Sequence, residues 1–352
     1  MKEDRPPARE AIAAAIRERS HPYSGPVPDA FAAWFREHYG PALIAVIAYG
    51  SRLSGTTASA TSIHDFYVVC SGYRAFYGRE RALHATLNQV LPPNIYELAF
   101  DDAALGRLQC KYCVISLADL ERETGSGARD LYHLGRFSKR MGIAHAADAG
   151  ALGRLVEVFL GATERMAEIA VPRLGPGGGG GGGGGGDGGD GGDGGDGGGD
   201  SPFTVERFSK ELLGLSYLAD RRIESPDKVD KLYASEAAHY AHLHGLLLER
   251  FAALGRVGVV ATGAGTYECR LPADARRRLV ARGERMLKRS RLRGQLRWPK
   301  YLLTFENWVD YMLDKIARAK GVEIRLTEAE RRHPLLAAAR YYWRLSRDRT
   351  LE

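Results

Sequence analysis

A tract of low complexity divides this chain. Nineteen of the 24 residues between Gly177 and Asp200 are glycine, and the other five are aspartate. Glycine loses the most backbone entropy on ordering and has no side chain to bury, so such a tract cannot contribute to a hydrophobic core. We expect a flexible linker or inserted loop over residues 175–200, within a chain of 352 residues whose length predicts about two domains.

The composition outside this tract is that of an ordinary globular protein. Hydrophobic residues make up 44% of the chain and charged residues 26%, which excludes a wholly disordered protein. The net charge is +7, and the aspartates of the tract leave +12 on the remainder, which favours an anionic partner: a phosphate-rich ligand, nucleic acid or an anionic lipid surface. Four cysteines are too few for a disulfide framework. Together with an N-terminus that resembles neither a signal nor a transit peptide, this predicts a cytoplasmic protein.

Strand-like and helix-like segments alternate in the first part of the chain. Four short apolar segments have the length and composition of strands: residues 42–49, 66–70, 95–100 and 112–116. The first is uninterrupted and bounded by Pro41 and Gly50, as expected for a strand buried on both faces. A helix-like pattern occupies residues 75–90. We predict an α+β fold that begins with a mixed-sheet domain over residues 1–150.

The second part is mainly helical. Apolar residues recur at helical spacing over residues 152–170, 205–222 and 229–254, and residues 257–269 fit a hairpin or wing. These segments predict a helical or winged-helix domain over residues 151–274, interrupted by the glycine tract. A basic helical region then covers residues 275–352.

The basic region is unusually one-sided in charge. From Arg276 to Lys300 there are 11 basic residues and one acidic residue. Trp298 lies near the end of this stretch, Tyr301 directly follows it, and Trp343 lies further on. Cations beside aromatic rings are typical of a helix that lies on an anionic membrane, so we predict a membrane dock here. Nucleic-acid binding and a plain solvated helix remain alternatives.

The most informative local pattern follows the first strand. Gly50 and Ser51 come directly after it, and Asp65 begins the next strand, which is the plan of nucleotidyltransferases. Gly50 would let the backbone approach a triphosphate, and the Ser51 hydroxyl would donate to its oxygens. Asp65 would hold Mg²⁺. The alternative is a plain turn with Asp65 as a cap.

A second metal-binding carboxylate is missing from its usual place. Many nucleotidyltransferases have Asp-x-Asp on this strand, whereas Asp65 is followed here by Phe66 and Tyr67. The second carboxylate must then come from elsewhere, and the candidates are Glu97, Asp119 and Asp220.

Four ordered motifs resemble those of one family. They are AYGS at 48–51 with the later Asp65, KYCVIS at 111–116, DLYHLGRFSK at 130–139, and GLSYLADRR at 214–222. The chain resembles the mitochondrial translocator assembly and maintenance protein family, the peripheral phosphatidate cytidylyltransferases, and in particular its bacterial relatives. One departure is Cys113, which stands where that family has glycine and creates a C-x-x-C sequence with Cys110. Both cysteines lie in or beside a strand, which does not favour redox or zinc chemistry.

The resemblance implies a reaction and a set of site residues. CTP and phosphatidic acid would give CDP-diacylglycerol and pyrophosphate, with Mg²⁺ as cofactor, on the inner face of the cell membrane. The catalytic residues would be Ser51, Asp65 and Asp220, with Asp65 and Glu97 on the metal. The nucleotide and phosphate groups would contact Gly50, Ser51, Lys111, Arg136, Lys139, Tyr217 and Arg222. Nucleic acid is not the partner that this resemblance favours.

Two other function classes remain open. A nucleotidyltransferase that acts on RNA or on another small acceptor would share Gly50, Ser51 and Asp65, but gives no reason for the motif at 214–222. A non-catalytic nucleic-acid-binding protein would explain the positive charge and would not depend on Asp65.

Overall fold

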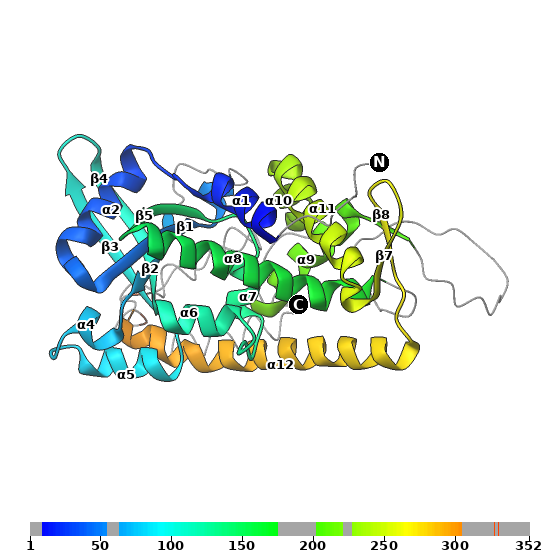
Figure 1. Cartoon of the computed structure of the whole chain (residues 1–352). Helices are drawn as coiled ribbons and strands as arrows, with labels where there is room; N and C mark the ends of the chain where they lie inside the picture. Colours follow the sequence, from blue (N-terminus) through cyan, green and yellow to red (C-terminus); the bar gives the residue numbers. More distant parts are fainter. Residues whose placement is uncertain are drawn as a thin grey trace.

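The structure is a computed structural model, and it describes residues 9–54, 63–174, 202–220, 227–304, 327 and 330 (Figure 1). The glycine tract, Arg222 and Trp343 lie outside the described residues. The fold is α+β, as predicted, with a five-stranded mixed sheet. A long helix, α12 (Ala273–Thr304), runs beside both the sheet and the helical part of the molecule.

The sheet has the order β3-β4-β2-β1-β5. Its strands are β1 (Leu43–Tyr49), β2 (His64–Cys70), β3 (Asn94–Asp102), β4 (Gly106–Ser116) and β5 (Gly142–Ala146). The pairing of β2 with β4 is parallel, and the other three pairs are antiparallel. The four strands predicted from apolar runs are confirmed, whereas β5 was not predicted.

Side chains of the sheet alternate between two apolar layers, as the period of a strand requires. Ile47, Tyr67 and Ile115 point into one layer, and Val46 and Val114 into the other. The first layer is covered by α1 (Arg9–Ser20), α6 (Leu117–Thr124), α7 (Tyr132–Phe137) and α8 (Ala149–Ala170). The second is covered by α2 (Pro26–Tyr39), α4 (Tyr73–Tyr77) and α5 (Ala82–Val90).

The single helix predicted over residues 75–90 is wrong, because the segment forms two helices. Gly78 ends α4 with a φ of +67°, a conformation that interrupts a helix and that glycine adopts without strain. Cys110 and Cys113 point into opposite layers of the sheet, so this C-x-x-C sequence does not bring its two thiols together.

The helical part packs onto the first layer of the sheet. It contains α9 (Val205–Asp220), α10 (Lys228–Ser235), α11 (Ala237–Ala253) and a small sheet of β6 (Phe203–Thr204), β7 (Val259–Gly263) and β8 (Thr266–Cys269). The predicted hairpin is confirmed in β7 and β8, while the helix predicted over 229–254 is divided at Glu236. Leu155, Leu212 and Leu247 belong to the same continuous core as the first layer of the sheet. This core therefore contains residues from both sides of position 150, the predicted domain boundary. Short elements complete the described part of the chain: η1 (Gly40–Ala42), α3 (Ser51–Ser54), η2 (Val171–Arg173) and η3 (Arg256–Gly258).

The basic stretch is helical, but its cations do not all face solvent. Arg297 and Lys300 are buried, and Arg293 is partly buried against acidic residues. Lys300 donates to the main-chain carbonyls of Leu87, Leu91 and Pro93, at and just beyond the end of α5. The prediction that the whole stretch is a surface dock is therefore wrong for these three residues. Among the helices that the structure describes, none is long and apolar enough to span a bilayer.

A buried histidine in the helical part predicts a pH dependence of stability. His244 of α11 is fully buried, its Nδ1 lies 2.8 Å from Ser209 Oγ, and burial lowers its pKa to about 3. Below pH about 6.5 the unfolded chain binds a proton there that the folded protein does not, so the free energy of unfolding falls as pH decreases, by up to about 1.4 kcal/mol per pH unit from this group. Urea unfolding measured between pH 6.5 and 4.5 gives the free energy of unfolding at each pH. This free energy should fall less steeply with decreasing pH for His244→Gln than for the wild type. Equal slopes would contradict this assignment.

Candidate functional site

The turn after β1 requires glycine for two reasons. Gly50 has a φ of +89°, which strains any other residue. A β-carbon at this position would also lie 2.7 Å from Oδ2 of Asp65, inside van der Waals contact. The structure thus brings together Gly50 and Asp65, which the sequence analysis placed in one site. Ser51 follows as the first residue of the short helix α3.

Strand register aligns charged side chains in one row across the sheet. Tyr49 pairs with Asp65, Asp65 with Lys111, and Lys111 with Glu97. Lys111 Nζ lies 2.9 Å from Asp65 Oδ1, and the two side chains are 14% and 21% exposed. Asp65 therefore lies within β2 and forms an ion pair across to β4, which differs from a carboxylate that merely caps a turn.

Arg136 approaches this row from α7. Its Nη1 donates to the Tyr49 hydroxyl at 3.5 Å, and its guanidinium lies 4.3 Å from the centre of the Tyr132 ring. Burial raises the pKa of the Tyr49 phenol well above its usual value, and Cys113 and Asp65 raise it further. The phenol stays protonated and lies 3.4 Å from Cys113 Sγ, to which its hydroxyl can donate. Cys113 thus supports the side chain that Arg136 contacts.

Two of the family-like motifs meet at the contact of α7 with α9. A β-carbon on Gly135 would lie 2.8 Å from the α-carbon of Ser216, so the two helices touch through their backbones here. One turn on, Lys139 Nζ lies 4.6 Å from the centre of the Tyr217 ring. Segments about 80 residues apart in the chain therefore form one wall beside the sheet.

Arg140 also holds the turn, although its role was not predicted. Its Nη1 donates to the Leu53 carbonyl of α3 at 2.9 Å and forms an ion pair with Glu236. Glu236 also binds Arg19 at 2.6 Å and is buried. The only hint in the sequence was that Arg140 directly follows Lys139, the last residue of the motif at 130–139. Because its guanidinium is held by the Leu53 carbonyl and by Glu236, we assign Arg140 to fixing the Ser51 helix and not to ligand binding.

Two of the three candidates for a second carboxylate, Glu97 and Asp119, do not join Asp65. Glu97 lies two strands away, about 10 Å between backbones, with Lys111 between them, and Gln109 donates to it. Asp119 lies in the first turn of α6, beyond the opposite end of β4, where it binds Arg122 and Tyr73. Asp220 is the last residue of α9, and its side chain lies outside the described part.

The residues present suit a polyanion together with a divalent cation. Lys111 is paired with the Asp65 carboxylate, Arg136 reaches the neighbouring Tyr49, and Lys139 adds a third positive charge beside Tyr217 of α9. Within the described ranges, no three His, Cys, Asp or Glu side chains group around a possible metal position. Mg²⁺ in nucleotide sites is bound by one or two carboxylates plus substrate phosphates, so Asp65 fits a metal that arrives with its nucleotide.

Comparison of the chain with protein-family models and with curated proteins found no match. A functional assignment therefore rests on the chemistry of the site and on the motifs that form it.

The contact between Gly50 and Asp65 can be tested by adding one carbon. Gly50→Ala should lower the free energy of unfolding by about 1–3 kcal/mol through backbone strain, with a further loss because the new methyl group displaces the Asp65 carboxylate. Gly106→Ala is the matched control, since Gly106 also has a positive φ, +73°, but open space around it. Chemical denaturation should show the larger loss at position 50. Equal losses would show that the contact with Asp65 is unimportant.

Proposed function

We propose that this protein is a Mg²⁺-dependent nucleotidyltransferase that joins CTP to phosphatidic acid. The observation that carries the proposal is the placement of Asp65 between the Gly50 turn and Lys111, on three neighbouring strands. The substrate pair rests on the four family-like motifs, and the contact of Gly135 with Ser216 supports treating two of them as one functional wall. The proposal includes a nucleotidyltransferase-type sheet domain and a winged-helix-type domain built from α9–α11 and the β7–β8 hairpin.

The reaction needs placement and charge neutralisation more than proton transfer. An oxygen of the lipid phosphate attacks the α-phosphorus of CTP and forms a new P–O bond, while the bond to the β-phosphate oxygen breaks and pyrophosphate leaves. A phosphate monoester is largely ionised near neutral pH, so no strong general base is required. Gly50 lets the triphosphate approach the backbone, and Ser51 donates to its oxygens. Lys111, Arg136 and Lys139 offset the negative charge of the two substrates.

Asp65 is the residue that would hold the metal ion. Mg²⁺, when bound, neutralises the triphosphate and assists departure of pyrophosphate. In the free protein the Asp65 carboxylate contacts Lys111. Binding of the nucleotide with its metal would exchange that contact, and Lys111 would then turn its ammonium group to a phosphate oxygen. Asp220, Tyr217 and Arg222 would close the site from α9 and the residues after it.

The reaction is tested by pyrophosphate release from CTP with Mg²⁺ and vesicles that contain phosphatidic acid. Turnover should require CTP, with ATP, GTP and UTP much poorer, and should require the lipid. Asp65→Asn should lower turnover by roughly a hundredfold or more, the scale of removing one group that stabilises charge in a transition state. Asp101→Asn, at an exposed position near the end of β3, is the control and should retain activity.

Two outcomes would contradict the proposal. CTP turnover with an RNA or small-molecule acceptor, and none with phosphatidic acid, would indicate a nucleotidyltransferase of another substrate class. No turnover with any nucleotide, from protein with a cooperative unfolding transition, would remove the enzymatic assignment altogether.

We also propose that the exposed face of α12 docks on an anionic bilayer. Apart from Arg277, which is paired with Asp274, its basic residues that face solvent are Arg278, Arg282, Arg285, Lys288 and Arg289. The same face continues to Leu292 and Leu296, which are 58% and 57% exposed. A nucleic acid would be attracted by the cations but offers no apolar layer for leucines, whereas a bilayer offers both. The side chains of Trp298 and Tyr301, which the sequence suggested as interfacial anchors, lie outside the described part.

Vesicle sedimentation tests this dock independently of catalysis. Each cation near an anionic surface contributes up to about 1 kcal/mol, so replacing Arg282, Arg285 and Arg289 by Gln should weaken binding to phosphatidate-containing vesicles at least tenfold. The control replaces Arg74, Arg79 and Arg107, which are also exposed, by Gln. It removes the same number of positive charges and should have a smaller effect on vesicle binding. Equal loss of vesicle binding in both triple variants would show that binding depends on net charge and not on the exposed face of α12.

A further inference from the structure

The buried face of α12 reaches the start of α7. Arg297 of α12 is completely buried, and its Nε donates to the Pro92 carbonyl at 3.0 Å. Its guanidinium lies 4.0 Å from the centre of the Tyr132 ring, at the beginning of α7. A buried guanidinium over an aromatic ring is an attractive contact, which is stronger when both groups are desolvated. Arg297 therefore contacts the helix that carries Arg136, one of the phosphate-binding cations of the proposed site.

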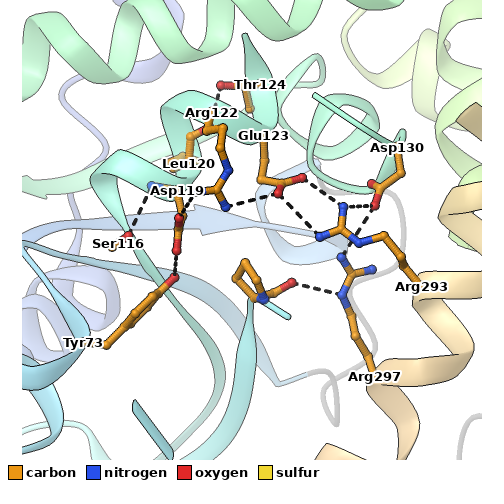
Figure 2. Close-up of polar contacts among 11 residues, drawn as sticks. Tyr73, Ser116, Asp119, Leu120, Arg122, Glu123, Thr124, Asp130, Arg293 and Arg297 are labelled. Atoms are coloured by element: carbon orange, nitrogen blue, oxygen red, sulfur yellow. Dashed lines mark hydrogen bonds and ion pairs between the residues drawn. The ribbon is translucent and has the colours of Figure 1, made fainter. Parts of the chain in front are cut away.

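A buried carboxylate fastens the same point. Asp130 accepts the Tyr132 N–H at 2.8 Å and Arg293 Nη1 at 2.6 Å, and Arg297 Nη2 lies 3.9 Å away. Glu123 also binds Arg293. Figure 2 shows both arginines extending from α12 toward the carboxylates of Glu123 and Asp130. Asp130 is 1% exposed and Glu123 3%, so these charges would be costly without the arginines.

The contacts continue from Tyr132 to the candidate site. Arg136 lies one helical turn after Tyr132 and places its guanidinium 4.3 Å from the centre of the same ring. It then donates to Tyr49, the residue before the Gly50 turn. The Tyr132 ring is thus shared by a buried arginine that makes no contact with the sheet row and by an arginine that reaches it.

We propose that Arg297 is a positioning residue that, through Tyr132, holds Arg136 in the orientation needed to bind the nucleotide. This inference rests on the proposed function. A long arginine side chain loses rotamer entropy when a ligand fixes it. If the Tyr132 ring is already held by Arg297, Arg136 loses part of that entropy before the ligand binds. Asp130 fixes the backbone at Tyr132 by accepting its main-chain N–H, and it offsets the positive charge of Arg297 and Arg293.

A double-mutant cycle tests this inference. The affinity for CTP with Mg²⁺ is measured by calorimetry for the full-length protein. Arg297→Gln should weaken binding about tenfold in the wild-type background and have no further effect in an Arg136→Gln background, because it acts through Arg136. A residue that merely stabilised the fold would have the same effect in both backgrounds. Arg277→Gln is the control, because Arg277 lies at an exposed position of α12 and pairs locally with Asp274. This variant should bind CTP like the wild type.

A second variant covers the case in which Arg297→Gln does not fold. Arg297→Lys keeps the positive charge beside Asp130 but lacks the flat guanidinium over Tyr132, so it should fold and still bind CTP several-fold more weakly. Folded Arg297→Lys protein with wild-type affinity, or a loss that persists in the Arg136→Gln background, would overturn the positioning role while leaving the proposed function intact. Wild-type protein that binds no CTP would instead overturn the proposed function, and the positioning role with it.

Discussion

The parallel pairing of β2 with β4, between antiparallel neighbours, is the constraint on which the candidate site depends. It places Lys111 beside Asp65, while the antiparallel pairing of β1 with β2 places the Gly50 turn on the other side of the same carboxylate. A shift of either pairing by one residue would turn these side chains to the opposite face of the sheet. The helices α7 and α9 can then complete the site only because the row of charges faces the layer into which they pack.

The long helix α12 links the five-stranded sheet to the helical part of the molecule. The exposed side of α12 carries cations and leucines, and its buried side carries Arg293, Arg297 and Lys300. The two sides differ because the buried side meets carboxylates and main-chain carbonyls of the sheet domain. A chain segment that looks uniformly basic therefore serves internal packing and surface charge at once.

The parts of the fold that depend on local pattern were predictable. The strand β1 is an uninterrupted apolar segment between Pro41 and Gly50, and the approach of Gly50 to Asp65 follows when consecutive strands pair antiparallel. The pairing of β2 with β4 was not predictable, because its register is set by packing and not by any turn between the two strands. The sequence also could not predict that Arg293 points into the protein, because its partner Asp130 is 163 residues away in the chain. The short strand β5 lacks the apolar density that identified the other strands.

The ion pair of Asp65 with Lys111 has a consequence for how this chain can change over time. Each group neutralises the other in a largely enclosed position, so loss of either one alone leaves a charge with little water around it. Gly50 narrows the choice further, since its missing β-carbon leaves the space that the Asp65 carboxylate occupies. The three positions form a coupled unit, in which an acceptable substitution at one requires a compensating substitution at another. Among homologous sequences they should vary together or not at all.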